Sequence, residues 1–271
     1  MKHTFLFLSL ILFSFNMFAQ KELFEKHIYY NENKELPYRL FVPKDVDIEN
    51  TVKEIIVENF IFIEKEVQKY PLILFMHGAG ERGNDNSMQL NYIDKVFGSN
   101  KFQAEHPCFV LAPQCPNELK WVEVSWSLDS HIQPETTSYS MELTMQIIDE
   151  LIAKYPIDTD RLYVTGLSMG GFGTWDIISR YPNKFAAAIP ICGGGDENTA
   201  FAISKTPIWA FHGAKDKVVK TSRSRNMIEA IKDVGGDPKY TEYPKLGHLC
   251  WNEAYATEGL FNWLFSQKLE N

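Results

Sequence analysis

Short apolar runs recur along the chain, and each ends at a polar loop rich in glycine or proline. Five runs have the continuous apolar pattern of parallel strands buried on both faces: residues 71–76, 108–112, 161–164, 185–191 and 207–211. Four segments carry apolar residues at helical spacing: residues 139–155, 172–178, 222–234 and 253–269. A last short strand is expected at 240–243. This alternation predicts an α/β fold with a mostly parallel, twisted sheet and helices on both faces.

The segment before the first buried run has a different pattern. Residues 24–30 and 38–42 are expected to be strands joined by the polar turn at 31–34, which predicts an antiparallel hairpin at one edge of the sheet. Residues 46–69 mix β-branched, apolar and acidic residues and fit either a strand or a helix, so this stretch is a possible insertion. Only about fifteen residues separate the fourth and fifth buried strands, which favours a small cap or none.

The first 19 residues have the pattern of an export signal. Lys2 and His3 precede an apolar run at 5–15, and Ala19 lies where cleavage is expected. The run is short for a membrane span, although an uncleaved N-terminal anchor is the alternative. We expect residues 20–271 to form one catalytic domain, with no membrane span in the mature chain and a periplasmic or secreted location.

The charge of the chain narrows the possible partners. The formal net charge is −8, and no basic stripe is visible, which does not suggest binding to nucleic acid or to anionic lipid. Export permits disulfides, yet the sequence does not choose a pairing among the four cysteines, and unpaired buried thiols are an equal alternative. Their spacing is too wide for a zinc signature; they are Cys108, Cys115, Cys192 and Cys250.

The segment 165–171, Thr-Gly-Leu-Ser-Met-Gly-Gly, lies between a predicted strand and a predicted helix. A Gly-x-Ser-x-Gly sequence in this context is typical of a nucleophile elbow, where the serine hydroxyl is exposed on a strained turn. Gly166 and Gly170 leave room where the strand and the helix pass close together. Ser168 is therefore the candidate nucleophile, and the N-terminus of the following helix favours a developing anion beside it.

A serine hydroxyl is a weak nucleophile at neutral pH, so it needs a base and an acid that orients the base. After such an elbow the expected chain order is acid, then histidine. Asp216 follows the strand at 207–211, and His248 follows the strand at 240–243. Both lie on loops at the sheet edge expected for Ser168, which predicts a catalytic triad. Asp196 and the adjacent Glu197 are the competing acids, although they follow an earlier strand.

The remaining histidines are assigned to structural roles. His77 and His212 each precede a glycine at the end of a strand, and we expect them to brace their loops through hydrogen bonds rather than to transfer protons. His27, His106 and His131 lie in segments without a strand end and are expected to be surface or packing residues.

An oxyanion hole needs two N–H donors aimed at the developing negative oxygen. Met169, directly after the nucleophile, is expected to supply one. The loop after the strand at 71–76 is expected to supply the other from Ala79, with Gly80 in reserve.

Five segments together resemble the carboxylesterase branch of the α/β-hydrolases, which includes phospholipase/carboxylesterases, polyhydroxybutyrate depolymerase-like proteins and feruloyl or acetylxylan esterases. The resemblance spans about residues 70–265 and is carried by residues 77–83 (HGAGERG), 112–116 (APQCP), 166–171 (GLSMGG), 212–216 (HGAKD) and 247–248 (GH). It implies hydrolysis of carboxylic esters through an acyl-enzyme, without a metal ion or an organic cofactor. Residues 46–69 depart from the compact family pattern.

The sequence says less about the substrate than about the mechanism. We take Arg82, Gln114, Trp126 and Trp251 as candidate substrate contacts, because each lies near a loop at the carboxyl end of a strand. An open, exported site suits ester groups on polysaccharides, such as acetyl or feruloyl groups. A prolyl-oligopeptidase-like peptidase and a catalytically silent binding protein on the same scaffold are the alternatives. The sequence does not determine the oligomeric state.

Overall fold

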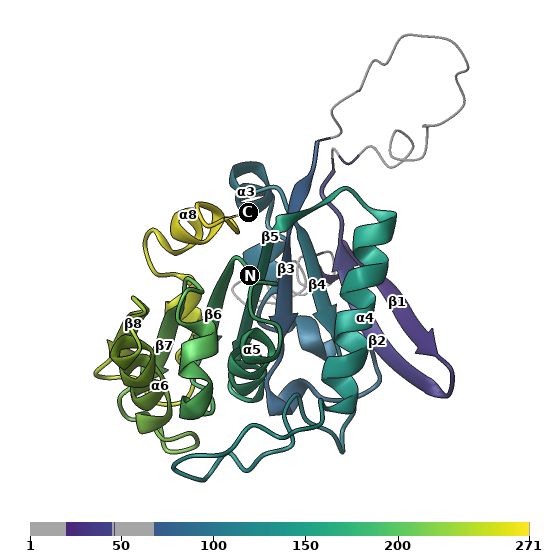
Figure 1. Cartoon of the computed structure of the whole chain (residues 1–271). Coiled ribbons are helices and arrows are strands. Elements are labelled where there is room, and N and C mark those ends of the chain that lie inside the picture. Colours follow the sequence, from purple (N-terminus) through teal and green to yellow (C-terminus); the bar gives the residue numbers. More distant parts are fainter. Residues whose placement is uncertain (1–19, 45, 47–67, 271) are drawn as a thin grey trace, which may run out of the picture.

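The computed structural model of this chain describes residues 20–44, 46 and 68–270 (Figure 1). The expected export signal, residues 1–19, and most of the possible insertion, residues 46–69, lie outside the described residues. Eight strands form one sheet in the order β1-β2-β4-β3-β5-β6-β7-β8. Their bounds are β1 Phe24–Asn31, β2 Lys34–Phe41, β3 Tyr70–Met76, β4 Phe109–Pro113, β5 Ile157–Leu167, β6 Ala187–Ile191, β7 Trp209–Gly213 and β8 Lys239–Tyr243.

The sheet confirms the fold class predicted from the sequence. Strands β3 to β8 run parallel to one another, β2 pairs antiparallel with β4, and β1 and β2 form the expected antiparallel hairpin at one edge. Every residue of β3 and β4 is buried, as their continuous apolar sequences predict for central parallel strands. The carboxyl ends of the parallel strands therefore meet at one edge, at the bottom of Figure 1.

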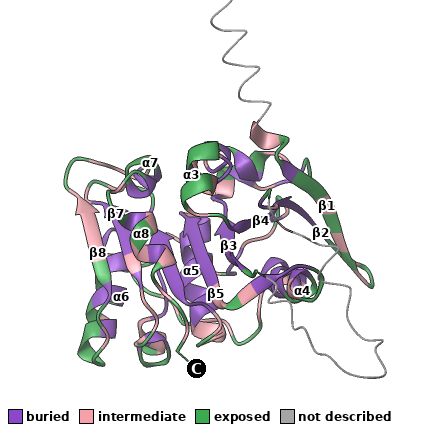
Figure 2. Ribbon diagram, turned by 90° about the horizontal axis from the view of Figure 1, so that it is seen from above, coloured by how far each residue is buried: buried purple, intermediate pink, exposed green. Residues whose placement is uncertain are grey.

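Helices cover both faces of the sheet. One face carries α4 (Tyr139–Lys154), α5 (Met169–Arg180) and α6 (Ser222–Asp233), whose apolar side chains pack on alternate residues of the strands. The other face carries α2 (Asp94–Phe97), α3 (Asn100–Glu105), α7 (Trp251–Tyr255) and α8 (Leu260–Phe265). From above, α4 and α6 lie on one side of the strands and α3 and α7 on the other (Figure 2). Three short 3-10 helices complete the described elements: η2 Ala79–Glu81, η3 Met88–Leu90 and η4 Glu197–Ile203.

The predicted closing helix over 253–269 is wrong. The chain forms α7 and then α8, because Gly259 between them has a φ of 77° and cannot continue a right-handed helix. The short helices α2 and α3 were not predicted, since four and six residues are too few to show helical spacing. Among the described residues, no helix is both long enough and apolar enough to cross a bilayer.

Candidate active site

The turn between β5 and α5 holds Ser168 in an unusual backbone conformation. Ser168 has φ 54° and ψ −116°, which a residue with a Cβ adopts only under strain. The turn is tight because a Cβ at Gly170 would overlap the carbonyl oxygen of Met76 at the end of β3. A Cβ at Gly166 would overlap the carbonyl of Gly170 in the same way. Two glycines thus allow the strand and helix to approach and place the serine at the carboxyl edge of the sheet.

Ser168, His248 and Asp216 form a continuous chain of hydrogen bonds. The Ser168 hydroxyl lies 2.8 Å from Nε2 of His248, and Nδ1 of His248 lies 2.7 Å from Oδ2 of Asp216. The His248 side chain is 14% exposed and the Asp216 side chain is fully buried. Since Nδ1–H donates to the carboxylate, Nε2 of the neutral imidazole accepts from the serine hydroxyl. This is the arrangement that a general base and its orienting acid require.

Both oxygens of Asp216 have two partners. Oδ1 accepts from the backbone N–H groups of Val218 at 2.8 Å and Val219 at 3.0 Å. Oδ2 accepts from His248 and also from Nε2 of His212 at 3.1 Å. Burial alone would raise the pKa of this carboxyl group, but the hydrogen bonds from the two histidines and the backbone outweigh burial and hold the pKa well below its usual range. Asp216 is therefore ionised and fixed in position.

The loops that carry the acid and the base are joined to each other. The backbone N–H of Lys215 donates to the carbonyl of Leu246 at 2.8 Å, and that of Ala214 donates to Tyr243 at 3.0 Å. A Cβ at Gly213 would overlap the carbonyl oxygen of Gly247, so only glycine permits this approach. The distance between Asp216 and His248 is thus set by backbone contacts as well as by their own hydrogen bond.

His212 is a member of the site that its sequence context did not reveal as such. It braces its loop, as expected, because Nε2–H points at the Val219 carbonyl and Nδ1 lies 2.7 Å from the Ser224 hydroxyl. The same Nε2–H also points at Asp216, so His212 orients the acid. A motif search could have found His212 only from its spacing, because it lies at the end of β7, four residues before Asp216.

The loop after β3 passes beside the nucleophile. A Cβ at Gly78 would lie 2.8 Å from the Leu167 side chain and 3.7 Å from its carbonyl oxygen, and Leu167 directly precedes Ser168. Ala79 is the first residue of η2 and Met169 the first of α5. The first N–H groups of a helix have no acceptor within it, so both residues have a backbone donor to offer to an anion. The structure brings the two candidate oxyanion donors to the same edge as the triad.

His77 fixes the base of this loop. Its Nδ1 lies 2.6 Å from the Gly78 carbonyl, and its Nε2 lies 2.9 Å from the backbone N–H of Cys115. Nδ1 must therefore carry the proton and Nε2 must accept. Complete burial lowers the pKa of His77 to about 4. This geometry agrees with the bracing role expected from the sequence.

The buried His77 predicts a pH dependence of stability. Between pH 6.5 and pH 4 the unfolded chain binds a proton at this position that the folded chain excludes, so stability should fall as the pH falls through this window. The contribution of His77 is at most about 3.5 kcal/mol, because one pKa unit corresponds to about 1.4 kcal/mol. Urea unfolding of the wild type and of His77→Asn from pH 4 to pH 8 checks this. The curves should run parallel above pH 7 and converge below pH 6; equal slopes throughout would contradict it.

The four candidate substrate contacts fall into different environments. Gln114 is fully buried, and its side chain binds the Glu81 carbonyl, the Asp85 carboxylate and the Asn86 backbone N–H, so it has no surface to offer a substrate. Trp251 is only 5% exposed, and its ring stands edge-on to His248 with centroids 5.8 Å apart. It supports the base from behind.

Arg82 and Trp126 are half-buried and adjacent. Nε of Arg82 donates to the Ala79 carbonyl at 2.9 Å, which ties Arg82 to the oxyanion loop. Its guanidinium lies 6.0 Å from the ring centre of Trp126, and the ammonium of Lys120 lies 5.2 Å from the same ring. The Trp126 indole N–H has no hydrogen-bond partner in the described part of the structure. These two residues remain candidate substrate contacts.

A long loop between β4 and α4, residues 114–138, runs along the catalytic edge, at the bottom of Figure 1. Two hydrogen bonds anchor it: Trp121 donates to the His77 carbonyl at 3.0 Å, and the backbone N–H of Gln133 donates to Asp196 at 2.7 Å. Asp196, the competing acid, thus holds this loop and also caps η4.

His131 packs against Phe172 and contacts Arg223, and burial together with that cation lowers the pKa of His131 to about 4.

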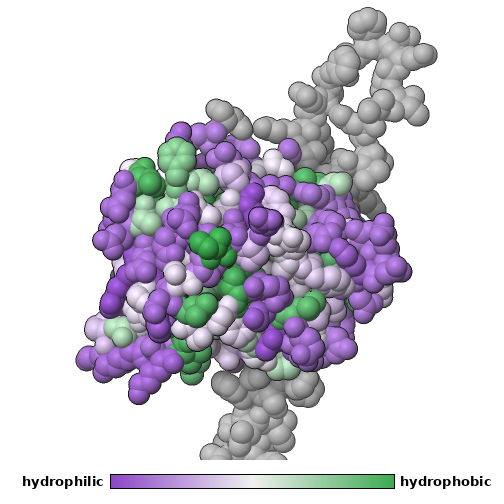
Figure 3. Space-filling view, turned by 60° about the horizontal axis from the view of Figure 1, so that its bottom comes forward, coloured by the Kyte–Doolittle hydropathy of each residue, from purple (hydrophilic) through white to green (hydrophobic). Residues whose placement is uncertain are grey.

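Apolar side chains are exposed on the loops of this edge. Seen from the bottom, apolar atoms gather near the middle of the face, among polar ones (Figure 3). Leu249, next to His248, is 69% exposed, and Val218, next to the acid loop, is 58% exposed. Leu128 and Ile132 on the β4–α4 loop are also exposed. The surroundings of the triad therefore offer apolar contact area to a bound molecule.

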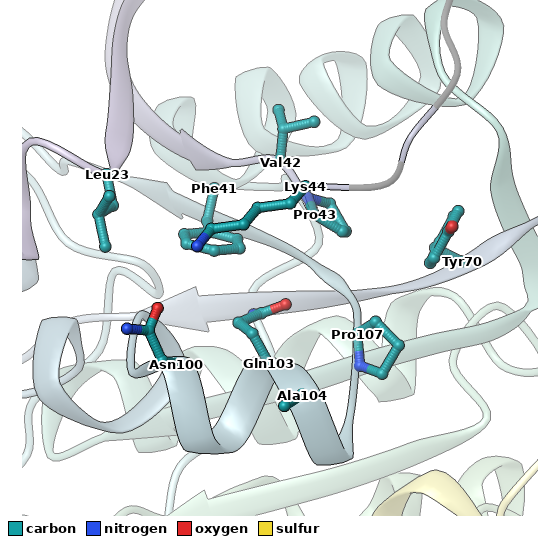
Figure 4. A pocket seen from close by; sticks show the side chains of 10 residues that line it. All are labelled: Leu23, Phe41, Val42, Pro43, Lys44, Tyr70, Asn100, Gln103, Ala104 and Pro107. Atoms are coloured by element: carbon teal, nitrogen blue, oxygen red, sulfur yellow. The ribbon is translucent and has the colours of Figure 1, made fainter.

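A pocket of about 330 Å³ lies elsewhere, between the end of β2 and α3 (Figure 4). Phe41, Tyr70 and Pro107 line it. Tyr70 begins β3 and Phe41 pairs with Val110 near the start of β4, so the pocket lies at the amino-terminal edge of the parallel strands. It is on the opposite edge of the sheet from Ser168 and has no part in the site.

The sheet, the elbow at the end of β5 and the loops around it define an α/β-hydrolase. The chain matches the phospholipase/carboxylesterase family over residues 57–257, and it belongs to that family. A solved thermostable esterase superposes on 92% of this chain with a TM-score of 0.78 at 38% identity, and the match covers 64% of that protein.

Two sequence relatives add detail. A bifunctional acetylxylan esterase/xylanase of Neocallimastix patriciarum is 35% identical over 88 residues, which is 32% of this chain and 13% of that protein. A probable carboxylesterase of Arabidopsis thaliana, described as SOBER1-like, is 26% identical over 208 residues, 71% of this chain and 77% of its own length. The chain thus spans less than two thirds of the acetylxylan esterase/xylanase and of the thermostable esterase.

Proposed function

We propose that this protein is an exported serine carboxylesterase. The observation that carries the proposal is the hydrogen-bonded chain from the strained Ser168 through His248 to Asp216. A serine held in this way has its base in place before substrate arrives, and the base has its tautomer fixed. Membership in the phospholipase/carboxylesterase family supports the ester bond as the target.

The reaction follows from this geometry. His248 Nε2 removes the hydroxyl proton as Ser168 Oγ attacks the ester carbonyl, and the backbone N–H groups of Ala79 and Met169 stabilise the oxyanion. The imidazolium, held by ionised Asp216, then gives its proton to the leaving alcohol. Water activated by His248 hydrolyses the acyl-enzyme and restores the serine. No step requires a metal ion or an organic cofactor.

The substrate is proposed to be a bulky ester, such as an acetyl or feruloyl group on a polysaccharide. The apolar side chains exposed around the triad favour an acyl or aryl group, and the half-buried Trp126 beside Arg82 and Lys120 offers a ring face and cations to a sugar. The match to the acetylxylan esterase/xylanase supports the same substrate class.

An ester and amide panel tests the function. We expect hydrolysis of p-nitrophenyl acetate, acetylated xylan or methyl ferulate by the wild type, and labelling of Ser168 by a fluorophosphonate probe. Activity in cell fractions should be found in the periplasm or the medium if residues 1–19 direct export.

Faster cleavage of prolyl amides than of esters would instead favour a peptidase. Failure to label would favour a silent binding protein.

A further inference from the structure

Cys192 lies directly beside the triad, although its position in the sequence gives no sign of it. It follows β6, is fully buried, and has a φ of 42°, which is uncommon for a residue other than glycine. Its backbone N–H donates to the carbonyl of Phe211 at the end of β7, at 2.8 Å. Because β6 lies between β5 and β7 in the sheet, Cys192 follows the strand between those that lead to Ser168 and to Asp216.

Three potential metal ligands converge here. The Sγ of Cys192, a carboxylate oxygen of Asp216 and a ring nitrogen of His248 all lie within 4.8 Å of one another. Thiolate, imidazole and carboxylate are the ligands that Zn²⁺ takes in proteins, at about 2.0–2.3 Å, so side-chain shifts of about an ångström bring all three into range. A soft thiolate favours Zn²⁺ or Cd²⁺ over Mg²⁺ and Ca²⁺, which prefer oxygen.

We propose that Cys192, Asp216 and His248 form an inhibitory binding site for thiophilic divalent ions such as Zn²⁺ and Cd²⁺. The ion binds Sγ of Cys192, the Asp216 carboxylate and Nδ1 of His248, the ring nitrogen that faces the acid. Water or the thiol of Cys250 completes the shell; the Cys250 side chain is buried and within hydrogen-bonding reach of Cys192. The partly exposed His248 side chain gives the ion access from solvent.

Binding of the ion changes which nitrogen of His248 carries the proton. The Cys192 thiol loses one proton to solvent as the S–metal bond forms. The imidazole proton leaves Nδ1, where the metal binds, and moves to Nε2. Nε2–H then donates to the Ser168 hydroxyl, 2.8 Å away, and cannot accept its proton. The base is lost without any change at the nucleophile. This inhibition rests on the proposed function, whereas binding of the ion does not.

Binding is tested first on Ser168→Ala, which keeps all three ligands and has no turnover. Calorimetric titration of the full chain with Zn²⁺ should show one site, absent with Mg²⁺. Adding Cys192→Ala should weaken it at least about tenfold, since even changes outside the ligand shell act on that scale. Cys108→Ala is the matched control: it removes another buried thiol, at the amino-terminal end of β4, and should keep the affinity. No binding, or equal affinity in all three proteins, overturns the proposal.

Inhibition is the second test. Zn²⁺ and Cd²⁺ should inhibit p-nitrophenyl acetate hydrolysis by the wild type, and a chelator should restore the rate. Inhibition of each protein is measured relative to its own metal-free rate. Cys192→Ala should need at least about ten times more Zn²⁺ than the wild type for the same degree of inhibition. If Cys192→Ala fails to fold, thiolate-to-metal charge-transfer absorption of Ser168→Ala with Cd²⁺ decides: absence of the band overturns the proposal. A protein that binds Cd²⁺ through sulfur but hydrolyses no ester would refute the proposed function and leave the metal site standing.

Discussion

Replacing Ser168 with alanine is expected to lower kcat for ester hydrolysis by about 10⁴-fold or more, the scale on which serine hydrolases lose turnover without their nucleophile. Alanine keeps the Cβ and the strained backbone of the turn, so only the hydroxyl is lost. Steady-state hydrolysis of p-nitrophenyl acetate measures the effect. Thermal unfolding should show that the variant is folded, since the hydroxyl makes its one described side-chain hydrogen bond to His248.

Ser179→Ala is the matched control. Ser179 lies on the same helix, α5, and its hydroxyl binds the Trp175 carbonyl and Thr199 away from the triad. Loss of the Ser179 hydroxyl should leave kcat within about threefold, because its hydrogen bonds lie away from the triad. Such a hydrogen bond contributes about 1 kcal/mol to the free energy of unfolding. Comparable activity in Ser168→Ala and the wild type would refute the role of Ser168.

Replacing Asp216 with asparagine is expected to lower kcat by about 10⁴-fold, as loss of the orienting carboxylate does in a serine protease triad. The two backbone N–H groups of Val218 and Val219 occupy the Oδ1 side, so the asparagine oxygen belongs there. The amide NH₂ then faces Nδ1 of His248 and Nε2–H of His212. A donor in this place favours the His248 tautomer with its proton on Nε2. Nε2 then cannot accept the proton of Ser168, so His248 cannot serve as the base. Pre-steady-state acylation measures this loss directly.

Asp196→Asn separates the two candidate acids. Asp196 is also buried, at 6% exposure, but it accepts from the backbone of Gln133 and caps η4. Its substitution should alter stability more than turnover. A larger loss of acylation rate in Asp196→Asn than in Asp216→Asn would assign the acid to Asp196 instead.

Most of the fold, and the proximity of Ser168, Asp216 and His248, follow from local sequence patterns. Buried parallel strands need continuous apolar runs, so their positions are visible in the sequence, and parallel strands bring the loops after β5, β7 and β8 to one edge. The order of the candidate residues along the chain then pairs Ser168 with Asp216 and His248. Gly166 and Gly170 mark, already in the sequence, where the strand and the helix approach closely, because only glycine fits there.

What the sequence could not predict depends on contacts between distant segments. Cys192 lies within reach of the Asp216 carboxylate because β6 and β7 are neighbours in the sheet, and His212 shares that carboxylate from the end of β7. The full engagement of Gln114 depends in the same way on residues 81–86 folding back onto β4. Apart from the four-residue spacing between His212 and Asp216, nothing in the local sequence carries that information.

The β4–α4 loop has one more consequence, for how this enzyme scaffold can be diversified. Arg180 at the far end of α5 donates to the Pro134 carbonyl and pairs with Asp176, which also binds Gln133. The β4–α4 loop is therefore bonded to the last turn of α5, the helix whose first turn follows Ser168. Residues 127–130 are exposed between the anchors at Trp121 and Gln133, so we expect them to tolerate exchange for new specificities while Ser168 stays in place.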